Sequence, residues 1–163
     1  GVANDFRRIG LVRNPYNFGT TTVASADTRR QLYAAVFSSV SGTFAADEEI
    51  NQASTGAVGK VVEYDATNKL LYWYQTRFPD VGTDSDGNST AFSGANAITG
   101  QTSSASATPN TGSSTDVNGV SITSGYSNPE LAADSGDIIY VEERSPITRA
   151  SDQTENIKLI IEF

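Results

Sequence analysis

Closely spaced oxygen-bearing side chains are the first candidates for chemistry in this sequence. In the stretch "TDSDGNST", Asp84, Asp86 and Asn88 occupy alternate positions around Gly87. Carboxylate and amide oxygens at this spacing suit a hard cation such as Ca²⁺, but the glycine is misplaced for a hand-type loop and no glutamate closes it. Tight turns demand the same residue types. We expect a hairpin turn, with a calcium site at Asp84, Asp86 and Asn88 as the alternative.

A second acidic group, Asp47, Glu48 and Glu49, lies in "ADEEI". Paired carboxylates are the catalytic groups of glycosidases. Adjacent residues of a strand point to opposite faces, however, so these three do not form a catalytic pair by themselves. Histidine and cysteine are absent, which removes the commonest general base and any thiolate ligand. We expect a solvated acidic loop, no catalytic residue and no cofactor, and a carboxylate-based glycosidase is the least favoured function.

The only tryptophan, Trp73, lies between Tyr72 and Tyr74. Such a row of aromatic rings could stack on a sugar or contact a partner protein. Aromatic residues in an alternating strand more often pack into the core and against the neighbouring strand. We expect core packing here, with the binding of a host-surface glycan as the alternative function.

The densest charged segment, "VEERSPITRASDQTEN", lies between two apolar runs near the end of the chain. One interpretation is a solvated surface loop. The other is a segment that contacts a partner, because arginine is enriched at interfaces, where its planar fork pairs with carboxylates. The candidate interface residues are Arg144, Arg149, Asp152 and Glu155.

Composition limits the kinds of partner. The 163 residues carry a formal net charge of -8, with 37% hydrophobic and 18% charged residues. Binding to a nucleic-acid backbone depends on clustered Lys and Arg, so the acidic excess argues against it. No apolar run approaches the roughly 18 residues that a membrane helix needs, so we expect no membrane partner. Methionine is absent, even at position 1, as expected of a processed or partial chain.

The elements that must position these residues are mainly strands. Many Val, Ile and Tyr residues among Ser, Thr, Asn and Gly are typical of a β-rich protein with long loops. We expect strands at 6–13, 137–142 and 157–163. Residues 32–40 fit both a helix and a strand, and their Val, Tyr and Phe favour the strand. A hairpin with a "DATN" turn is predicted at 58–75, and bulk on both faces of its second strand indicates a small barrel or sandwich.

Two further segments are expected to lie outside strands. Residues 100–119 are nearly all Ser, Thr, Ala, Gly and Asn, which lack the apolar surface needed for order, so a flexible loop is predicted. Farther on, Asn128 can cap a helix, Pro129 suits its first position and Glu130 its first turn. We therefore predict one helical turn there. The expected fold class is mainly β, a β-rich α+β fold with at most one or two short helices.

Three stretches, "FRRIGLVRNP", "SGDIIYVEERSPI" and the final "DQTENIKLIIEF", resemble a known family. The family is the baseplate wedge protein, wedge subunit eight, of contractile-tailed phages of the T-even type, and the likeness is to its C-terminal part. The two later stretches are the most specific, because they are long and of unusual composition. Between the ends the chain departs from the family pattern, where a short linker stands. The intervening residues look like glycine-punctuated β modules of structural proteins from cyanophages, which infect marine cyanobacteria.

From this resemblance we expect a discontinuous wedge-protein core at 1–41 and 125–163, with a small sheet made by the two chain ends. Residues 42–124 would form an inserted compact β-barrel or sandwich module. The resemblance implies a non-catalytic structural subunit of the virion tail baseplate, assembled in the host cytoplasm. Its implied partners are other baseplate wedge subunits and a second copy of itself in a homodimer.

Overall fold

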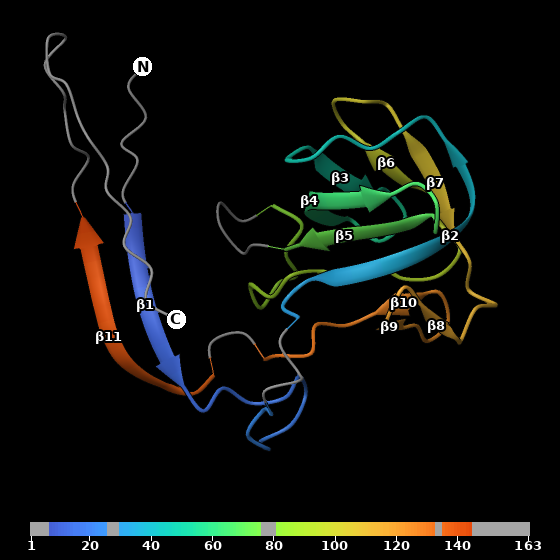
Figure 1. Cartoon of the computed structure of the whole chain (residues 1–163). Coiled ribbons are helices and arrows are strands. Elements are labelled where there is room, and N and C mark those ends of the chain that lie inside the picture. Colours follow the sequence, from blue (N-terminus) through green and yellow to red (C-terminus); the bar gives the residue numbers. More distant parts are fainter. Residues whose placement is uncertain (1–6, 26–29, 76–80, 133–134, 145–163) are drawn as a thin grey trace, which may run out of the picture. The chain divides into compact units, whose positions relative to one another are not determined.

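The computed structural model describes residues 7–25, 30–75, 81–132 and 135–144, with the backbone alone at 7–9 and 143–144. Every regular element within these ranges is a β-strand (Figure 1), and the strands pair antiparallel. The predicted, mainly β fold class is therefore confirmed. None of the described residues belongs to a helix that could cross a membrane.

The chain forms two compact units. The smaller is made by the two chain ends, Gly1–Asn14 and Gly136–Phe163, and the larger by Pro15–Ser135. The predicted boundaries, with 1–41 and 125–163 as one unit, lie farther inside the chain. Strand β2 (Tyr33–Ser41), which that division assigns to the core, belongs to the larger unit, because its neighbours on both edges are strands of that unit.

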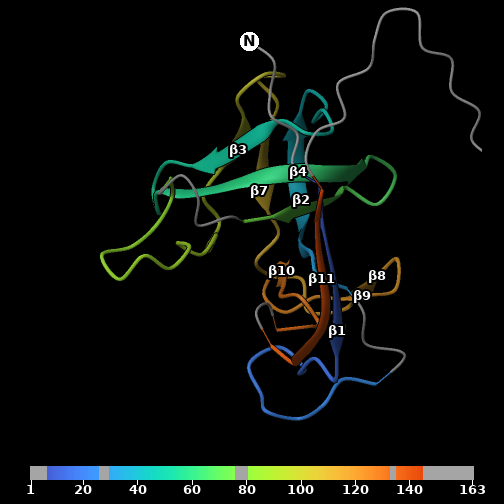
Figure 2. The same cartoon turned by 90° about the vertical axis from the view of Figure 1, so that its left-hand side faces the viewer.

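The smaller unit contains a two-stranded ribbon of β1 (Arg7–Arg13) and β11 (Asp137–Arg144). The two strands lie side by side in Figures 1 and 2. A register shift between Leu11 and Val12 marks a β-bulge, which increases the local twist. The predicted sheet made by the two chain ends is confirmed in these strands, and the predicted strand at 157–163 lies outside the described residues.

The larger unit is built around a closed antiparallel barrel. Its strands are β2, β3 (Glu49–Gln52), β4 (Ala57–Asp65), β5 (Leu70–Tyr74), β6 (Ile98–Gly100) and β7 (Ser106–Pro109). The order around the barrel is β2-β5-β4-β3-β6-β7, and β7 pairs with β2 to close it (Figure 1). Closure leaves no free edge in the barrel. Strand β2 shifts register between Phe37 and Ser39, where its pairing changes to β7.

Alternating side chains of β2 and β5 enter two different cores. Those that point inward fill the barrel: Ala35, Phe37, Leu71 and Trp73. Those that point outward form a second cluster: Ala34, Val36 and Leu70. The second cluster is covered by a short hairpin of β8 (Asp116–Val117) and β9 (Val120–Ser121). The sequence predicts apolar residues on both faces of a strand in a barrel or sandwich. Here one face packs inside the barrel, and the other packs against the β8–β9 hairpin.

The predicted hairpin is confirmed as β4 and β5. Its "DATN" turn starts at Asp65, whose Oδ1 accepts hydrogen bonds from the amides of Thr67 (2.9 Å) and Asn68 (3.1 Å). The Asn68 side chain donates to Oδ2 of the same carboxylate at 2.6 Å. These local bonds set the turn and hence the register of the hairpin.

Residues 100–119, predicted as a flexible loop, contain β7 and β8. Ala105 and Ala107 are buried, and the backbone of β7 pairs with β6 on one side and β2 on the other. Small side chains bury little apolar area each, but barrel closure supplies their backbone groups with partners on two sides. Composition alone does not contain that information.

The predicted helical turn at 128–130 is wrong. The segment follows β10 (Tyr126–Ser127), which pairs with β2. The Glu130 amide donates to the carbonyl of Arg30 (2.7 Å), and the Glu130 carbonyl accepts from the amide of Phe18 (2.8 Å). The Glu130 carbonyl, which a continuing helix would pair internally, is therefore used by a distant segment.

Candidate assembly surface and buried polar sites

The β1–β11 ribbon exposes apolar side chains along much of its length. Ile138, Ile139, Tyr140 and Val141 are 48–70% exposed, and Leu11 on the facing strand is 53% exposed. Successive residues of a strand point to opposite faces, so apolar groups lie on both faces of the ribbon. Contiguous exposed apolar surface is uncommon on soluble monomers and marks interaction sites. The ribbon is therefore the candidate assembly surface.

An exposed ion pair joins the two strands at one end of the ribbon. Arg13 Nη2 lies 3.4 Å from Asp137 Oδ2, and the two side chains are 64% and 65% exposed. A pair so exposed contributes only about 0–1 kcal/mol, because water screens it. The ribbon is thus held mainly by its backbone ladder rather than by its charges.

The predicted interface residues lie at and beyond the other end. Arg144 is the last residue of β11 and stands opposite Arg7 in the register. Arg149, Asp152 and Glu155 lie outside the described residues. The role of these four residues in partner binding stays a prediction.

The acidic stretch around Glu48 is not the solvated loop that the sequence predicts. Glu48 is 4% exposed, although its two acidic neighbours are exposed. Its carboxylate accepts hydrogen bonds from the amides of Ala45 (2.6 Å), Thr102 (3.1 Å) and Ser103 (2.9 Å), and from the Ser103 hydroxyl (2.8 Å). Glu48 thereby ties the segment before β3 to the turn between β6 and β7.

The environment of Glu48 favours its charged form. Burial alone would raise the pKa of the carboxyl, but the hydrogen bonds from Ser103, Ala45 and Thr102 outweigh burial and hold the pKa below its ordinary value. The site is also full, because a Cβ on Gly100 would lie 2.6 Å from Glu48 Oε2. A carboxylate that is ionised and already bound on all sides acts as an internal anchor rather than as a general acid.

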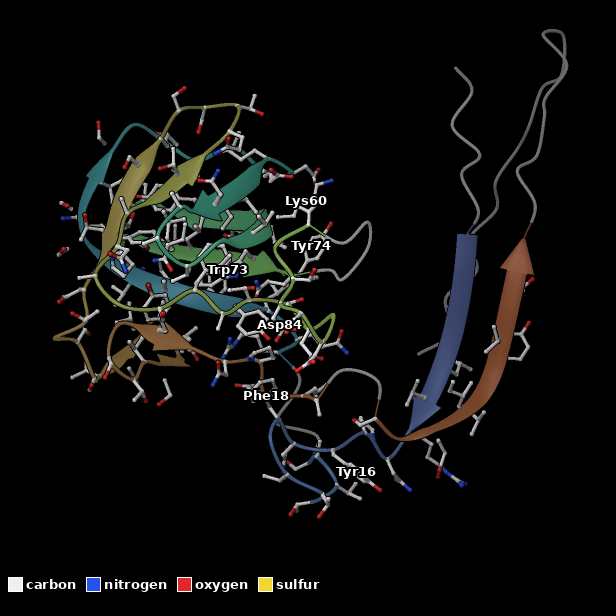
Figure 3. All side chains as sticks on the ribbon, turned by 180° about the vertical axis from the view of Figure 1, so that it is seen from behind. Tyr16, Phe18, Lys60, Trp73, Tyr74 and Asp84 are labelled. Carbon is white, nitrogen blue, oxygen red and sulfur yellow. The ribbon has the colours of Figure 1, made fainter. Side chains whose placement is uncertain are left out.

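Trp73 lies inside the barrel and is 1% exposed (Figure 3). Its ring stacks on Tyr33 with centroids 5.9 Å apart and meets the edge of Phe92 at 5.1 Å. Gly59 leaves the space for it, since a Cβ there would lie 2.6 Å from Trp73 Cδ1. The predicted core packing is confirmed. Because Trp73 is buried, it cannot stack on a glycan as the alternative function would require. Tyr74, at the end of β5, is an exposed aromatic residue.

The predicted turn at Asp84 is confirmed. Asp84 Oδ1 accepts hydrogen bonds from the amides of Asp86 and Asn88, both at 2.9 Å. Gly87 takes a φ of +77°, and its amide donates to the Asp84 carbonyl at 3.0 Å. In the part of the chain that the structure describes, no three His, Cys, Asp or Glu residues gather closely enough to hold a metal. A calcium site at these residues stays a prediction that the turn itself does not require.

Arg30 is a structural clamp that sequence reasoning missed. Its guanidinium donates to the carbonyl of Leu32, to the Ser127 hydroxyl (2.7 Å) and to the Asn128 carbonyl (2.8 Å). Its own amide donates to the Glu130 carboxylate at 2.9 Å. Burial lowers the pKa of Arg30, and the charge of Glu130 partly offsets this effect. The planar fork joins the entry to β2 with the segment after β10, and no short motif announces such a contact.

The fold and this surface define an all-β protein whose most prominent feature is an exposed apolar ribbon. Residues 88–163, just under half of the chain, match the family model described as Bacteriophage T4, Gp8. This part of the chain is thus similar to a family of phage baseplate structural proteins. No curated protein and no solved structure matches the chain.

The matched region includes two of the three stretches that carry the resemblance, "SGDIIYVEERSPI" and "DQTENIKLIIEF". The predicted resemblance is therefore confirmed over residues 88–163, as a similarity to that family. The stretch "FRRIGLVRNP" lies outside the match. The match also begins at Asn88, within the range 42–124 that the sequence assigns to an inserted module. Strands β6 to β11 thus fall within the matched region.

Proposed function

We propose that this chain is a non-catalytic subunit of the baseplate wedge of a contractile phage tail and acts by protein–protein assembly. The match of residues 88–163 to a baseplate structural family supports this role. In this role the protein resides in the tail baseplate of the virion, after assembly in the host cytoplasm.

The observation that carries the proposal is the exposure of residues 138–141, which are 48–70% exposed on β11. Moving one large apolar side chain from water into an interface is favourable by about 1.5–3 kcal/mol. Part of that gain is offset by the loss of freedom on association. A ribbon with apolar groups on both faces can still supply enough apolar surface for a specific interface.

The proposed partners are other wedge subunits and a second copy of the chain in a homodimer. Arg144 follows the apolar part of β11 after two glutamates, and Arg149, Asp152 and Glu155 lie farther along the sequence. An apolar centre bordered by charged residues is the usual composition of protein interfaces. We propose that these four residues form the polar rim of the assembly surface.

We further propose that the barrel is a module inserted between the two strands of the ribbon, related to modules of cyanophage structural proteins. The chain leaves the smaller unit at Asn14 and returns to it at Gly136, as expected of an insertion. Because the family match begins at Asn88, the part of the barrel most foreign to the family would be β2 to β5.

The test is wedge assembly with variants of the ribbon. Co-expression of Ile138→Ser/Tyr140→Ser with the other wedge proteins, followed by sedimentation, is expected to show loss of assembled wedges. Val62→Ser is the control, because Val62 is also an apolar residue with an exposed side chain, 40% exposed, but belongs to the barrel. If the ribbon variant assembled into wedges as well as the wild type does, the ribbon would not be the assembly surface.

Substitutions in the charged segment test the rim. Arg144→Ala and Asp152→Ala are expected to weaken assembly or folding. Normal baseplates from both variants, with an unchanged free energy of unfolding, would show that the charged segment has no such role.

A further inference from the structure

We infer that the outer backbone edge of β1, which has no partner among the described residues, receives an extended segment of another baseplate protein, with an apolar centre and carboxylates at both ends. This inference rests on the proposed function, because it names the kind of partner that the ribbon would take. It adds the edge, the backbone mode of binding and the charge of the partner.

Strand β1 has one backbone edge without a partner strand among the residues that the structure describes. In the described part of the chain, β1 pairs with β11 and β11 pairs with β1, without a further neighbour on either side. An edge strand presents a row of amide and carbonyl groups, to which an extended segment can add by main-chain hydrogen bonds. Both outer edges of the ribbon have this property, so another feature must distinguish them.

Charge distinguishes the two edges. Strand β1, "RRIGLVR", contains three of the chain's 11 Lys and Arg residues and no carboxylate. Strand β11, "DIIYVEER", contains three carboxylates and one arginine. In a chain of net charge -8, β1 is a local exception. A segment with carboxylates at its ends is attracted to β1 and repelled by β11.

The middle of β1 fits an apolar centre. Leu11 and Val12 are 53% and 50% exposed. Gly10 between the charged ends leaves open space, since the nearest atom to a Cβ placed there is the Tyr140 carbonyl oxygen at 3.9 Å. Glycine within a strand often marks the close approach of another chain. An aromatic residue of the partner, placed across from Gly10, would cover this gap.

Two synthetic peptides test the inference on the full chain. Both have alternating Val and Thr around a central Phe, and one ends in Glu on both sides whereas the other ends in Lys. Fluorescence anisotropy of the labelled peptides gives Kd at low and at physiological salt. We expect the Glu-ended peptide to bind about tenfold more tightly at low salt, with the difference shrinking as salt rises, because the pairs are exposed.

A charge swap locates the binding edge. In the wild-type chain, Arg13 Nη2 lies 3.4 Å from Asp137 Oδ2. The double substitution Arg13→Asp/Asp137→Arg keeps an ion pair between the strands but moves the positive charge from β1 to β11. We expect binding of the Glu-ended peptide to weaken severalfold. Lys60→Glu is the control, because it reverses an exposed cation on the barrel (Figure 3) and should leave Kd unchanged.

Three results would overturn the inference. One is no binding, or equal binding of the two peptides. Another is photo-crosslinking from the central Phe position to β11 or to the barrel instead of to residues 9–13. The third is a dimer mass in solution that the charge swap reduces to that of a monomer, which would assign the edge to a second copy. None of these results decides the baseplate role, which depends on the wedge-assembly test.

Discussion

Among single side chains, Glu48 has the environment with the largest consequence for folding. A carboxylate taken out of water is costly unless hydrogen bonds replace its hydration, and here three amides and one hydroxyl do so. Asp65 makes similar bonds in the β4–β5 turn, and hydrogen bonding from Asn68 likewise lowers its pKa. Asp65 is only partly buried, however, and among the carboxylates that the structure describes Glu48 alone is fully buried.

Glu48→Gln is expected to lower the free energy of unfolding by about 1–3 kcal/mol at neutral pH, because an amide NH₂ would face backbone donors. Urea unfolding followed by Trp73 fluorescence measures it. Glu49→Gln, at the exposed neighbour, is the matched control and should change stability little. Equal effects of the two substitutions would contradict the anchoring role of Glu48.

The same site predicts a pH dependence. The pKa of Glu48 is held below its ordinary value, so its contribution to stability is fully present above the unfolded-state pKa. It is lost as the pH falls through the folded-state pKa. The stability difference between wild type and Glu48→Gln should therefore shrink in acid. Unfolding midpoints measured across that range check this, and a constant difference would speak against a charged Glu48.

Among the strands, β2 organises the larger unit. It pairs with β5 and β10 through its first residues and with β7 through its last. The segment that leads into it is held by Arg30, which bonds to Ser127 and Asn128 from the other end of the unit. The entry to β2 and the exit from β10 are therefore coupled by one side chain.

Arg30→Lys is expected to lower the free energy of unfolding by about 1–3 kcal/mol, because one ammonium cannot replace the bonds of the planar fork. Amide hydrogen exchange at Phe18 and Glu130 should become faster, since their bonds lie beside the clamp. Arg13→Lys, at the exposed pair of the ribbon, is the control and should change stability far less. Unchanged exchange at Phe18 and Glu130 would show that Arg30 does not hold this segment.

For the chain as a whole, net charge and the apolar ribbon act in opposition. The net charge of -8 makes copies repel one another at neutral pH and so weakens their association, and the sequence pI is about 4.4. As the pH falls toward that value, carboxylates are protonated and the repulsion disappears. Without this charge repulsion, the exposed apolar ribbons of different copies can associate.

We therefore expect light scattering to rise as the pH approaches 4.4. The rise should be smaller for Ile138→Ser/Tyr140→Ser, which leaves the net charge unchanged and makes the ribbon polar. Identical scattering curves for the two proteins would show that association does not use the ribbon.

Local patterns were sufficient for much of this architecture. The apolar runs of β1 and β11, the alternation in β4 and β5, and the β-branched and aromatic residues of β2 predict strands correctly, because side-chain period and propensity act within a few residues. The same alternation places Trp73 on one face of β5 with Leu71, but only the folded chain shows that this face lines the barrel interior. The turns at Asp65 and Asp84 could also be predicted, since each carboxylate bonds amides two to four residues away.

Contacts between distant residues were decided only by the folded chain. Glu48 is buried because amides more than fifty positions away, at Thr102 and Ser103, close over it. Strand β7 forms from an unpromising Ser/Ala segment because β2 and β6 flank it. Arg30 binds Ser127 from 97 positions away and helps fix the non-helical path of residues 128–130. Each outcome depends on which backbone groups barrel closure brings together, and no local pattern of residues encodes that.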